Sequence, residues 1–299
     1  MKNNFKAIVD KSNVFNHIDH LEVGTLDLSS GKINSHTFSI LEKLDRPVAF
    51  DLASITKVLT NGLIRLIDPD LDEEDLRLCL EHQSGIPAWG LLSKSKWKEE
   101  ILSFDIKASD CRYSDYGAIR AMLIFEKLTG KSLYKQAFKF WDKEVFHWLD
   151  KRDDYTFLKT GDRHKNSILG DVHDPNAFNV KEKLSHAGLF ATTTGLLKTV
   201  QNIFTQQKFC ELLISSKKEN PDNRFHHGWD TPSAEGSLAG EGFSPFTFGH
   251  LGFTGTMIWV DLESRKAISV LSNGTRDGWY KKDELNKVRK SVSTIFWNS

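Results

Sequence analysis

The stretch that decides the fold is Pro47-Val48-Ala49-Phe50-Asp51-Leu52-Ala53-Ser54-Ile55-Thr56-Lys57. Its first four residues form a short apolar run, which is typical of a buried strand. From Ser54 the apolar residues recur at helical spacing as far as Ile67, and Pro69 closes the segment. The sequence therefore predicts a strand that leads directly into a helix over 54–67.

Outward from this stretch, strand patterns occur near both ends of the chain. The alternating run 20–27, the turn 29–32 and the weaker run 33–40 predict a hairpin. Near the C-terminus, the runs 256–261 and 267–271 predict two further strands, joined by a turn over 262–265. A basic, amphipathic helix is predicted over 281–297.

The middle of the chain is mostly helical in pattern. The predicted helices cover 71–81, 116–128, 133–148 and the part of 188–204 that follows a turn of small residues; 150–186 and 219–246 are typical of loops. We therefore expect an α+β fold, in which an antiparallel sheet built from both termini is flanked by helices. Residues 1–65 and 245–299 would form the sheet domain, and 66–244 a mainly helical insert.

Composition excludes several classes of protein. The 299 residues are 39% hydrophobic, and 40 basic residues balance 40 acidic ones, so an extended disordered chain or a nucleic-acid-binding surface is not expected. The apolar runs are all shorter than a membrane-spanning helix. Three cysteines without a C-x-x-C pair, and an N-terminus without an apolar signal region, favour free thiols in a cytoplasmic protein. A sequence from which a signal had been removed would have the same pattern and a periplasmic or secreted location.

Ser54 and Lys57 are the first candidates for chemistry. At positions i and i+3 of a helix the two side chains share a face, so the lysine lies near the serine hydroxyl. If Ser54 opens the helix, its backbone N–H points from the positive end of the helix dipole and is suited to stabilise an oxyanion.

The S-x-x-K pattern alone is weak, because a solvated serine near a solvated lysine is its usual explanation. It also occurs at Ser29, Ser93, Ser95, Ser132 and Ser215. Only Ser54 follows a strand-like run and opens a strongly apolar helix, in which burial lowers the pKa of an amine.

Two later motifs complete the set. Tyr113-Ser114-Asp115 is the chain's one Tyr followed two residues later by Asn or Asp, although a loop tyrosine and a helix-capping aspartate are the usual explanation of such a pattern on its own. His250-Leu251-Gly252 lies on a predicted strand, where the glycine permits close approach of a ligand to the backbone. The alternative there is an edge strand with a core histidine.

In this order the three motifs resemble those of the β-lactamase-related serine hydrolases, which include class C β-lactamases, DD-carboxypeptidases and family VIII esterases of the penicillin-binding-protein fold. Further stretches resemble segments of that family from about residue 20 to the end. They are 51–57, 81–87, 172–177, 186–190, 228–231 and 248–256. The resemblance implies a β-lactamase/transpeptidase-like fold, in agreement with the predicted strands and helices.

The resemblance also implies roles for the motif residues. Ser54 would be the acylated nucleophile, and Lys57 with Tyr113 would transfer protons. His250 would stand where many members have a lysine. The backbone N–H groups of Ser54 and Phe253, the latter beside Gly252, would form the oxyanion hole.

Two departures from the family pattern bear on the substrate. Asp115 stands where asparagine is usual, and an anion beside Lys57 favours its ammonium form, so Tyr113 becomes the expected base. Leu251 replaces a residue that is often threonine, which removes a hydroxyl that would hold a substrate carboxylate. Together they favour esters or amides with a neutral end over penicillins and D-Ala-D-Ala peptides.

The remaining candidates are weaker. Trp229 could line a substrate pocket because it lies in a Gly-rich loop that leads to His250, although core packing is the more usual role of a tryptophan. His186 and His173 could also line the pocket, and a structural role explains these two equally well. The spacing of the histidines fits neither a metal site nor another cofactor site. We expect a serine hydrolase that acts on a small molecule or short peptide without nucleic acid or membrane as partner. A DD-peptidase or weak β-lactamase, and an inactive binding protein of the same fold, remain alternatives, and the oligomeric state stays open.

Overall fold

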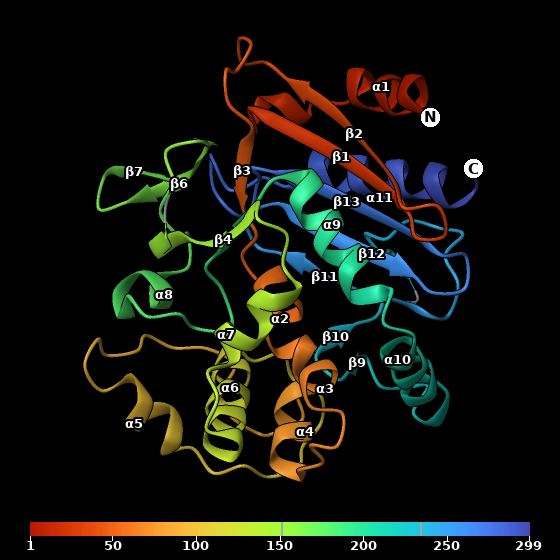
Figure 1. The fold of residues 1–299 in the computed structure, drawn as a ribbon. Coiled ribbons are helices and arrows are strands. Elements are labelled where there is room, and N and C mark those ends of the chain that lie inside the picture. Colours follow the sequence, from red (N-terminus) through yellow and green to blue (C-terminus); the bar gives the residue numbers. More distant parts are fainter. Residues whose placement is uncertain (151, 234) are drawn as a thin grey trace.

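Strands from the two ends of the chain pair in the centre of one sheet (Figure 1). The computed structural model describes residues 1–150, 152–233 and 235–299. In it, β1 (His20–Asp27) runs antiparallel to β13 (Lys266–Ser272), with Thr25 opposite Ile268. The strand order of this seven-stranded sheet is β2-β1-β13-β12-β11-β10-β9. The predicted antiparallel sheet from both termini is therefore confirmed.

The other strands of this sheet are β2 (Lys32–Ser39), β12 (Thr256–Asp261), β11 (Thr247–Gly252), β10 (Trp229–Asp230) and β9 (Phe225–His226). Every residue of β12 is buried. Its alternate side chains enter two different cores, because Ile258 packs on one face of the sheet and Trp259 on the other. A strand covered on both faces has a continuous apolar sequence, which explains the pattern of 256–261.

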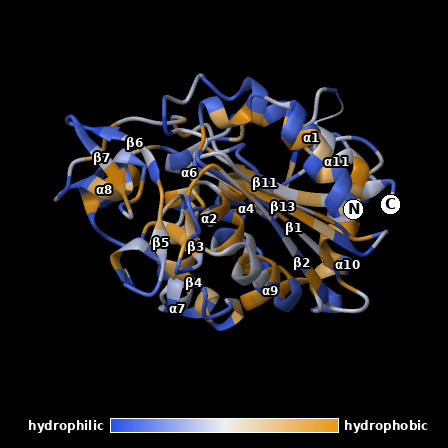
Figure 2. Cartoon of the chain, turned by 90° about the horizontal axis from the view of Figure 1, so that it is seen from above, coloured by the Kyte–Doolittle hydropathy of each residue, from blue (hydrophilic) through white to orange (hydrophobic). Residues whose placement is uncertain are grey.

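Helices cover both faces of the sheet (Figure 2). α1 (Lys2–Lys11) and α11 (Asp283–Trp297) lie on one face, where Val288 and Val292 share a core with strands β1, β12 and β13. α9 (Thr193–Phe204) lies on the other face, and α10 (Gln207–Glu219) follows it. The predicted packing of the terminal helix against the sheet is confirmed.

The remaining helices lie below the sheet in the view of Figure 1. They are α2 (Ile55–Leu59), α3 (Ile64–Ile67), α4 (Glu74–Leu80), α5 (Trp97–Leu102), α6 (Asp115–Thr129), α7 (Leu133–Ala137) and α8 (Pro175–Val180). Ser114 caps α6 by accepting the N–H of Gly117, and Gly130 ends that helix in the left-handed region.

Short strands connect the helical part to the sheet. A four-stranded sheet has the order β4-β8-β3-β5, and β6 pairs with β7. Their bounds are β3 (Val48–Asp51), β4 (Val145–His147), β5 (Thr156–Phe157), β6 (Lys159–Arg163), β7 (Asn166–Leu169) and β8 (Leu189–Ala191). The segment 150–186, predicted as loop, thus contains three strands and α8.

Two predicted helices are shorter in the structure. The helix predicted over 133–148 ends at Ala137, because Phe146 pairs with Phe190 of β8 and draws the chain into strand β4. The helix predicted over 54–67 is interrupted after Leu59, where Thr60 donates to the carbonyls of Thr56 and Ser185. In both places tertiary contacts override the local periodicity.

The division of the chain into two domains at residues 65 and 245 remains a prediction. Three elements of the predicted insert belong to the large sheet or pack on it, namely α9, β9 and β10.

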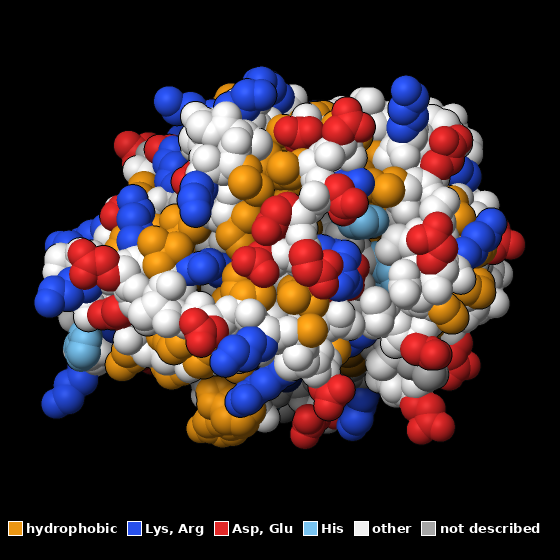
Figure 3. Space-filling model, turned by 90° about the horizontal axis from the view of Figure 1, so that it is seen from below, with side chains coloured by type: hydrophobic (Ala, Val, Ile, Leu, Met, Phe, Trp, Pro, Cys, Tyr) orange, Lys and Arg blue, Asp and Glu red, His pale blue; other side chains and the backbone are white. Residues whose placement is uncertain are grey.

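All three cysteines are free, as expected. None of the described helices is long and apolar enough to cross a membrane. The face seen in Figure 3 carries basic and acidic side chains interspersed, with hydrophobic ones between them.

The double-sided burial of the sheet gives a stability prediction. Ile268 is fully buried in the core beneath the terminal helices. Ile268→Ala should lower the free energy of unfolding by about 2–5 kcal/mol, because it removes buried methyl groups and leaves a cavity. Urea denaturation measures this, with Ile40→Ala as the control, since Ile40 is 57% exposed. Equal effects of the two substitutions would contradict the packing described here.

Candidate active site

Ser54 lies at the start of α2, after a loop that a single buried carboxylate holds in place. Ala53 has a φ of 46°, a left-handed conformation that costs a non-glycine residue about 1–3 kcal/mol. The side chain of Asp51 accepts the N–H of Ala53 at 2.8 Å and that of His173 at 2.7 Å. Burial raises the pKa of Asp51 to about 6. The side chain of Asp51, at the end of β3, thus stabilises the backbone conformation that precedes Ser54.

Lys57 connects three separate segments of the chain. Its Nζ donates to Ser54 Oγ at 3.1 Å and to the carbonyl oxygen of His186 at 3.0 Å. It also forms an ion pair with Asp115 Oδ1 at 2.7 Å. The lysine side chain is 3% exposed, so a charge at this position depends on these partners. The serine and the lysine of the predicted S-x-x-K motif are therefore in contact, and Asp115 is a further partner of the lysine.

The protonation state of this group follows from its neighbours. Burial is the largest single influence and by itself lowers the pKa of Lys57, but the charges and hydrogen bonds of Asp115 and Tyr113 together outweigh it and raise the pKa above the ordinary lysine value. Burial also raises the pKa of Tyr113, against the field of Lys57 and with the help of Asp115. At neutral pH the site therefore holds an ammonium at Lys57 and a neutral phenol at Tyr113.

Tyr113 lies between two uncharged histidines. Lys57 Nζ is 5.0 Å from the centre of the Tyr113 ring, and the rings of His82 and His250 lie 4.7 and 5.8 Å from it. Burial lowers the pKa of His82 well below its ordinary range and that of His250 to about 3. His250 is therefore neutral.

The hydrogen bonds of these histidines define their tautomers. His250 Nδ1 donates to the carbonyl of Leu251 at 2.7 Å, which leaves Nε2 as a buried acceptor without a partner among the described residues. His82 Nδ1 accepts the N–H of Ser114 at 3.1 Å, so this histidine holds the loop that carries Tyr113. The Tyr113 hydroxyl is likewise buried, with no partner in the described part of the chain.

Gly252 brings the end of β11 against the nucleophile loop. A Cβ at this position would lie 2.5 Å from the carbonyl oxygen of Leu52 and 1.9 Å from Thr256 Oγ1. The sequence suggested close approach of a ligand here, and the structure shows close approach of the Ser54 loop instead. Within the described residues, the N–H groups of Ser54 and Phe253 donate to no other group. Both remain available to a ligand.

Ser54, Tyr113, Asp115 and Phe253 border a cavity of about 750 Å³, whereas Lys57, His82 and His250 lie behind its lining. Its lining combines the reacting groups with exposed aromatic side chains and two carboxylates. The lining residues are Ala53, Ser54, Trp89, Tyr113, Asp115, His173, Asp174, Pro175, His186, Ala187, Phe253 and Trp279. A basic lysine or arginine does not occur among them. A cavity of this size suits a small molecule or the end of a peptide.

His186 and His173 both line this cavity, as expected. His186 Nε2 lies 2.9 Å from Asp174 Oδ1, and this contact, against the opposing effect of burial, lowers the pKa of Asp174 to about 2. The ring of His173 packs against Phe253 at 5.4 Å, and burial lowers its pKa to about 4. The residues described contain no group of three or more side chains placed to hold a metal ion.

Two predicted substrate-binding residues lie outside the cavity. Trp229 is fully buried in the core, where it packs on Phe204 and donates to the carbonyl of Gly62 at 2.9 Å. Leu251 packs against the core on the opposite face of the sheet from Phe248, because successive side chains of a strand alternate. Both expectations are corrected: neither side chain lines the cavity.

Sequence reasoning missed several residues of the site, among them Trp89 of the cavity lining and the three that follow. His82 lies in a stretch that the sequence marked only as similar to a family loop. Asp174 is the helix cap of α8, and its side chain accepts the N–H of Ala177. Trp279 follows the last strand, in a segment without any pattern that indicates a pocket. Only the packing of distant loops shows that all three border or support the site.

Comparison with known proteins shows which family has this sequence. The family model described as Beta-lactamase matches residues 75–291, which is most of the chain. The chain belongs to the Beta-lactamase family. The resemblance stated from the motifs is thereby confirmed, although the match itself begins after Ser54 and Lys57.

Curated relatives share shorter parts of the sequence. A putative D-alanyl-D-alanine carboxypeptidase of Escherichia coli O157:H7 is 34% identical over 122 residues, 35% of this chain and 26% of the relative. An N-acetylmuramyl-L-alanine amidase of Bacillus subtilis strain 168 is 25% identical over 197 residues, 54% of this chain and 44% of the relative. This member of the Beta-lactamase family thus matches less than half the length of these relatives.

Solved structures share the fold over nearly the whole chain. The D-amino acid amidase of Ochrobactrum anthropi SV3 superposes with a TM-score of 0.68 at 14% identity, covering 99% of this chain and 98% of that one. A mutant simvastatin synthase of Aspergillus terreus gives 0.67 at 13% identity, with 99% and 97% covered. A beta-lactamase of Mycobacterium bovis gives 0.61 at 16%, with 98% and 97% covered. At these identities the likeness establishes the fold alone.

The pKa shifts predict an alkaline pH dependence. Since Asp115 raises the pKa of both Lys57 and Tyr113, either one becomes a base only as the pH rises. The rate of acylation by a fluorophosphonate should increase between pH 7 and 9, by roughly tenfold per unit below the governing pKa. Asp115→Asn removes the negative charge, lowers both pKa values and should move this limb to lower pH.

The control for this experiment is Asp110→Asn, which removes an exposed carboxylate from the same loop. Its profile should coincide with that of the unaltered protein. A rate that stays constant from pH 6 to 9, or an identical shift in the two variants, would contradict the assignment.

Proposed function

We propose that the protein is a serine hydrolase that forms an acyl-enzyme at Ser54 and cleaves a small amide or ester. The observation that carries this proposal is the contact of Ser54 Oγ with Lys57 Nζ at 3.1 Å, at a helix start that borders a cavity of about 750 Å³. The amidase and carboxypeptidase names of the relatives agree with this reaction class.

The reaction begins when Ser54 Oγ attacks the substrate carbonyl carbon. The oxygen of that carbonyl becomes an oxyanion, which the free N–H groups of Ser54 and Phe253 stabilise. Collapse of the tetrahedral intermediate expels the amine or alcohol and leaves an ester on Ser54. Water then attacks this ester, which releases the acid and regenerates the hydroxyl of Ser54.

Tyr113 and Lys57 transfer the protons in this proposal. The resting phenol of Tyr113 first loses its proton to solvent, which is why the reaction speeds up as the pH rises. Because Lys57 is an ammonium, its field stabilises the resulting phenolate, which accepts the proton of Ser54. The phenol formed then protonates the leaving group. Lys57 stays charged throughout, since Asp115 and the carbonyl of His186 remain its partners.

The charges of the cavity indicate the substrate. Asp115 and Asp174 line it, His173 in its lining is neutral, and the described lining contains neither lysine nor arginine. Since Leu251 lies on the other face of the sheet, the case against carboxylate substrates rests on these charges. We propose substrates whose free end is neutral or carries an ammonium group.

Intact-mass analysis after incubation with a fluorophosphonate tests the reaction. One adduct per chain is expected, and Ser54→Ala should abolish it. Ser29→Ala is the matched control, because Ser29 and Lys32 form the same pattern in a surface turn and the variant should label normally. An unlabelled protein would favour the inactive binding protein instead.

A matched set of substrates tests the charge preference. Alanine p-nitroanilide with a free amino group, as either enantiomer, should be cleaved at least as fast as its N-acetyl form. The N-succinyl form should react roughly tenfold or more slowly, because its carboxylate lacks a charge-assisted partner worth about 1.5–3 kcal/mol. Faster acylation by a penicillin than by any simple amide or ester would favour the DD-peptidase or β-lactamase alternative.

We also propose a cytoplasmic location. Three free thiols fit the cytoplasmic location expected from the sequence. The substrate remains the one partner that we propose.

A further inference from the structure

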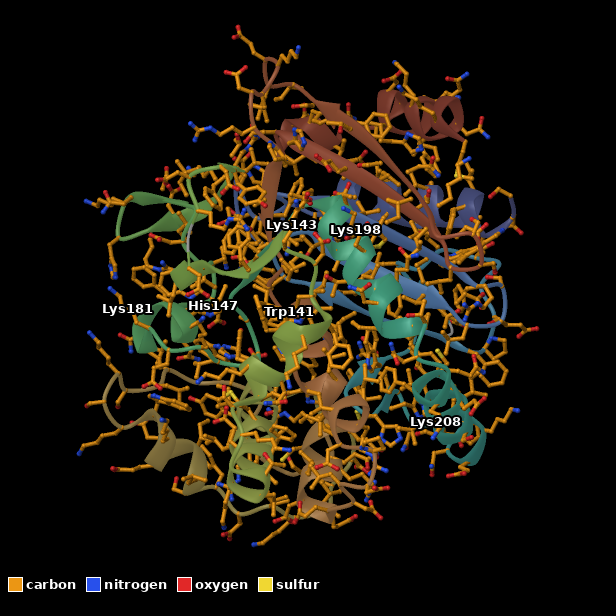
Figure 4. All side chains as sticks on the ribbon, viewed as in Figure 1. Trp141, Lys143, His147, Lys181, Lys198 and Lys208 are labelled. Carbon is orange, nitrogen blue, oxygen red and sulfur yellow. The ribbon has the colours of Figure 1, made fainter. Side chains whose placement is uncertain are left out.

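A second cavity lies beside α7 and β4, apart from the proposed active site. Its volume is about 660 Å³. The residues that line it are Glu126, Ser132, Tyr134, Lys135, Phe138, Trp141, Lys143, Val145, Phe146, His147, Asp150, Arg152 and Lys183. None of these residues lines the cavity at Ser54. Figure 4 labels Trp141, Lys143 and His147, which lie along the chain that leads from α7 into β4.

Aromatic rings form the walls of this second cavity. Tyr134 packs edge-to-face against Trp141 at 5.5 Å and against His147 at 5.4 Å. Trp141 Nε1 donates to the carbonyl of Leu59 at 2.8 Å, and the Tyr134 hydroxyl donates to that of Leu184 at 3.3 Å. These hydrogen bonds fix the rings, so the cavity is formed before any ligand binds.

The polar rim of the cavity has an excess of positive charge. Its basic residues are Lys135, Lys143, Arg152 and Lys183, and its acidic residues are Glu126 and Asp150. Burial lowers the pKa of His147 to about 3, so this ring contributes no charge. The excess charge therefore comes from the lysine and arginine side chains.

The partners of these charges leave two lysines without a counter-charge. Lys183 pairs with Asp150, and Arg152 pairs with Asp154 outside the cavity. Glu126 accepts the N–H of Leu133. Within the described ranges, no ion pair involves Lys135 or Lys143.

An exposed aromatic side chain lies at the mouth of this cavity, close to the unpaired lysines. Phe138 is 63% exposed, although it packs against Trp141 at 5.9 Å. A large apolar side chain at the rim of a fixed aromatic cavity provides contact area for an apolar body. The neighbouring ammonium groups provide a partner for an anionic head.

From these observations we propose that this cavity is a second ligand site, which binds an amphiphilic anion. The ring or acyl body of the ligand lies between Tyr134, Phe138 and Trp141, and its carboxylate or sulfonate pairs with Lys143. The site differs in charge from the cavity at Ser54, which is lined by carboxylates. The two cavities therefore favour ligands of different charge.

A pair of fluorescent probes tests this site on the full-length protein. 8-Anilinonaphthalene-1-sulfonate carries the anionic head, and N-phenyl-1-naphthylamine is the same ring system without it. Lys143→Gln should raise the Kd of the sulfonate by about tenfold, the effect of losing a charge-assisted hydrogen bond, and leave that of the neutral probe unchanged. Phe138→Ala should weaken both probes.

Lys198→Gln is the matched control, because Lys198 lies on the same face in Figure 4 and does not line the cavity. Its effect on the sulfonate should be less than twofold. Circular dichroism establishes that each variant is folded. Unchanged sulfonate binding in Lys143→Gln, or equal weakening in the Lys143 and Lys198 variants, would overturn the proposal. So would equal weakening of both probes by Lys143→Gln.

Discussion

The buried ammonium of Lys57 is the constraint on which the candidate site depends. A charge removed from water is tolerated only when protein groups replace the hydrogen bonds of water. Here the partners of the ammonium come from three segments that are distant from one another in the sequence. Ser54 comes from the start of α2, Asp115 from the start of α6, and the His186 carbonyl from the segment before β8. One side chain thus fixes the relative positions of the nucleophile, the helix that follows Tyr113 and one wall of the cavity.

The sheet provides the second constraint, since it sets the position of the Ser54 loop. Thr254 and Thr256 donate hydroxyl groups to the backbone carbonyls of Asp51 and Leu52, at 2.6 and 3.2 Å. Gly252 permits this contact because a side chain there would overlap Leu52. The two N–H groups that we assign to the oxyanion therefore come from segments about two hundred residues apart, which hydrogen bonds hold together.

Charge distribution separates the two cavities of the molecule. The cavity at Ser54 has two carboxylates and neither lysine nor arginine in its described lining, whereas the rim of the cavity at Trp141 has four basic and two acidic side chains. The zero net charge of the chain conceals this difference. Trp141 also donates to the carbonyl of Leu59, in the helix that carries Lys57, so the aromatic wall of one cavity contacts a structural element of the other.

The sequence by itself determined the elements whose periodicity is strong and whose chemistry is local. Strand alternation and helical spacing can be recognised within a few residues of sequence. They therefore predicted the hairpin of β1 and β2, the strands β12 and β13, the helices α6 and α11, and the Ser54–Lys57 pair. The motif order of Ser54, Tyr113 and His250 also sufficed for the family. These features depend on neighbours in the chain.

Only the tertiary structure decided which side chains reach the cavity and in which protonation state. Leu251 and Trp229 were expected there, yet strand alternation directs one to the opposite face and core packing encloses the other. His82, Asp174 and Trp279 were missed, since their place depends on loops far away in the sequence. The neutral state of His250 follows from its burial near Lys57, a consequence of packing that a residue pattern does not contain.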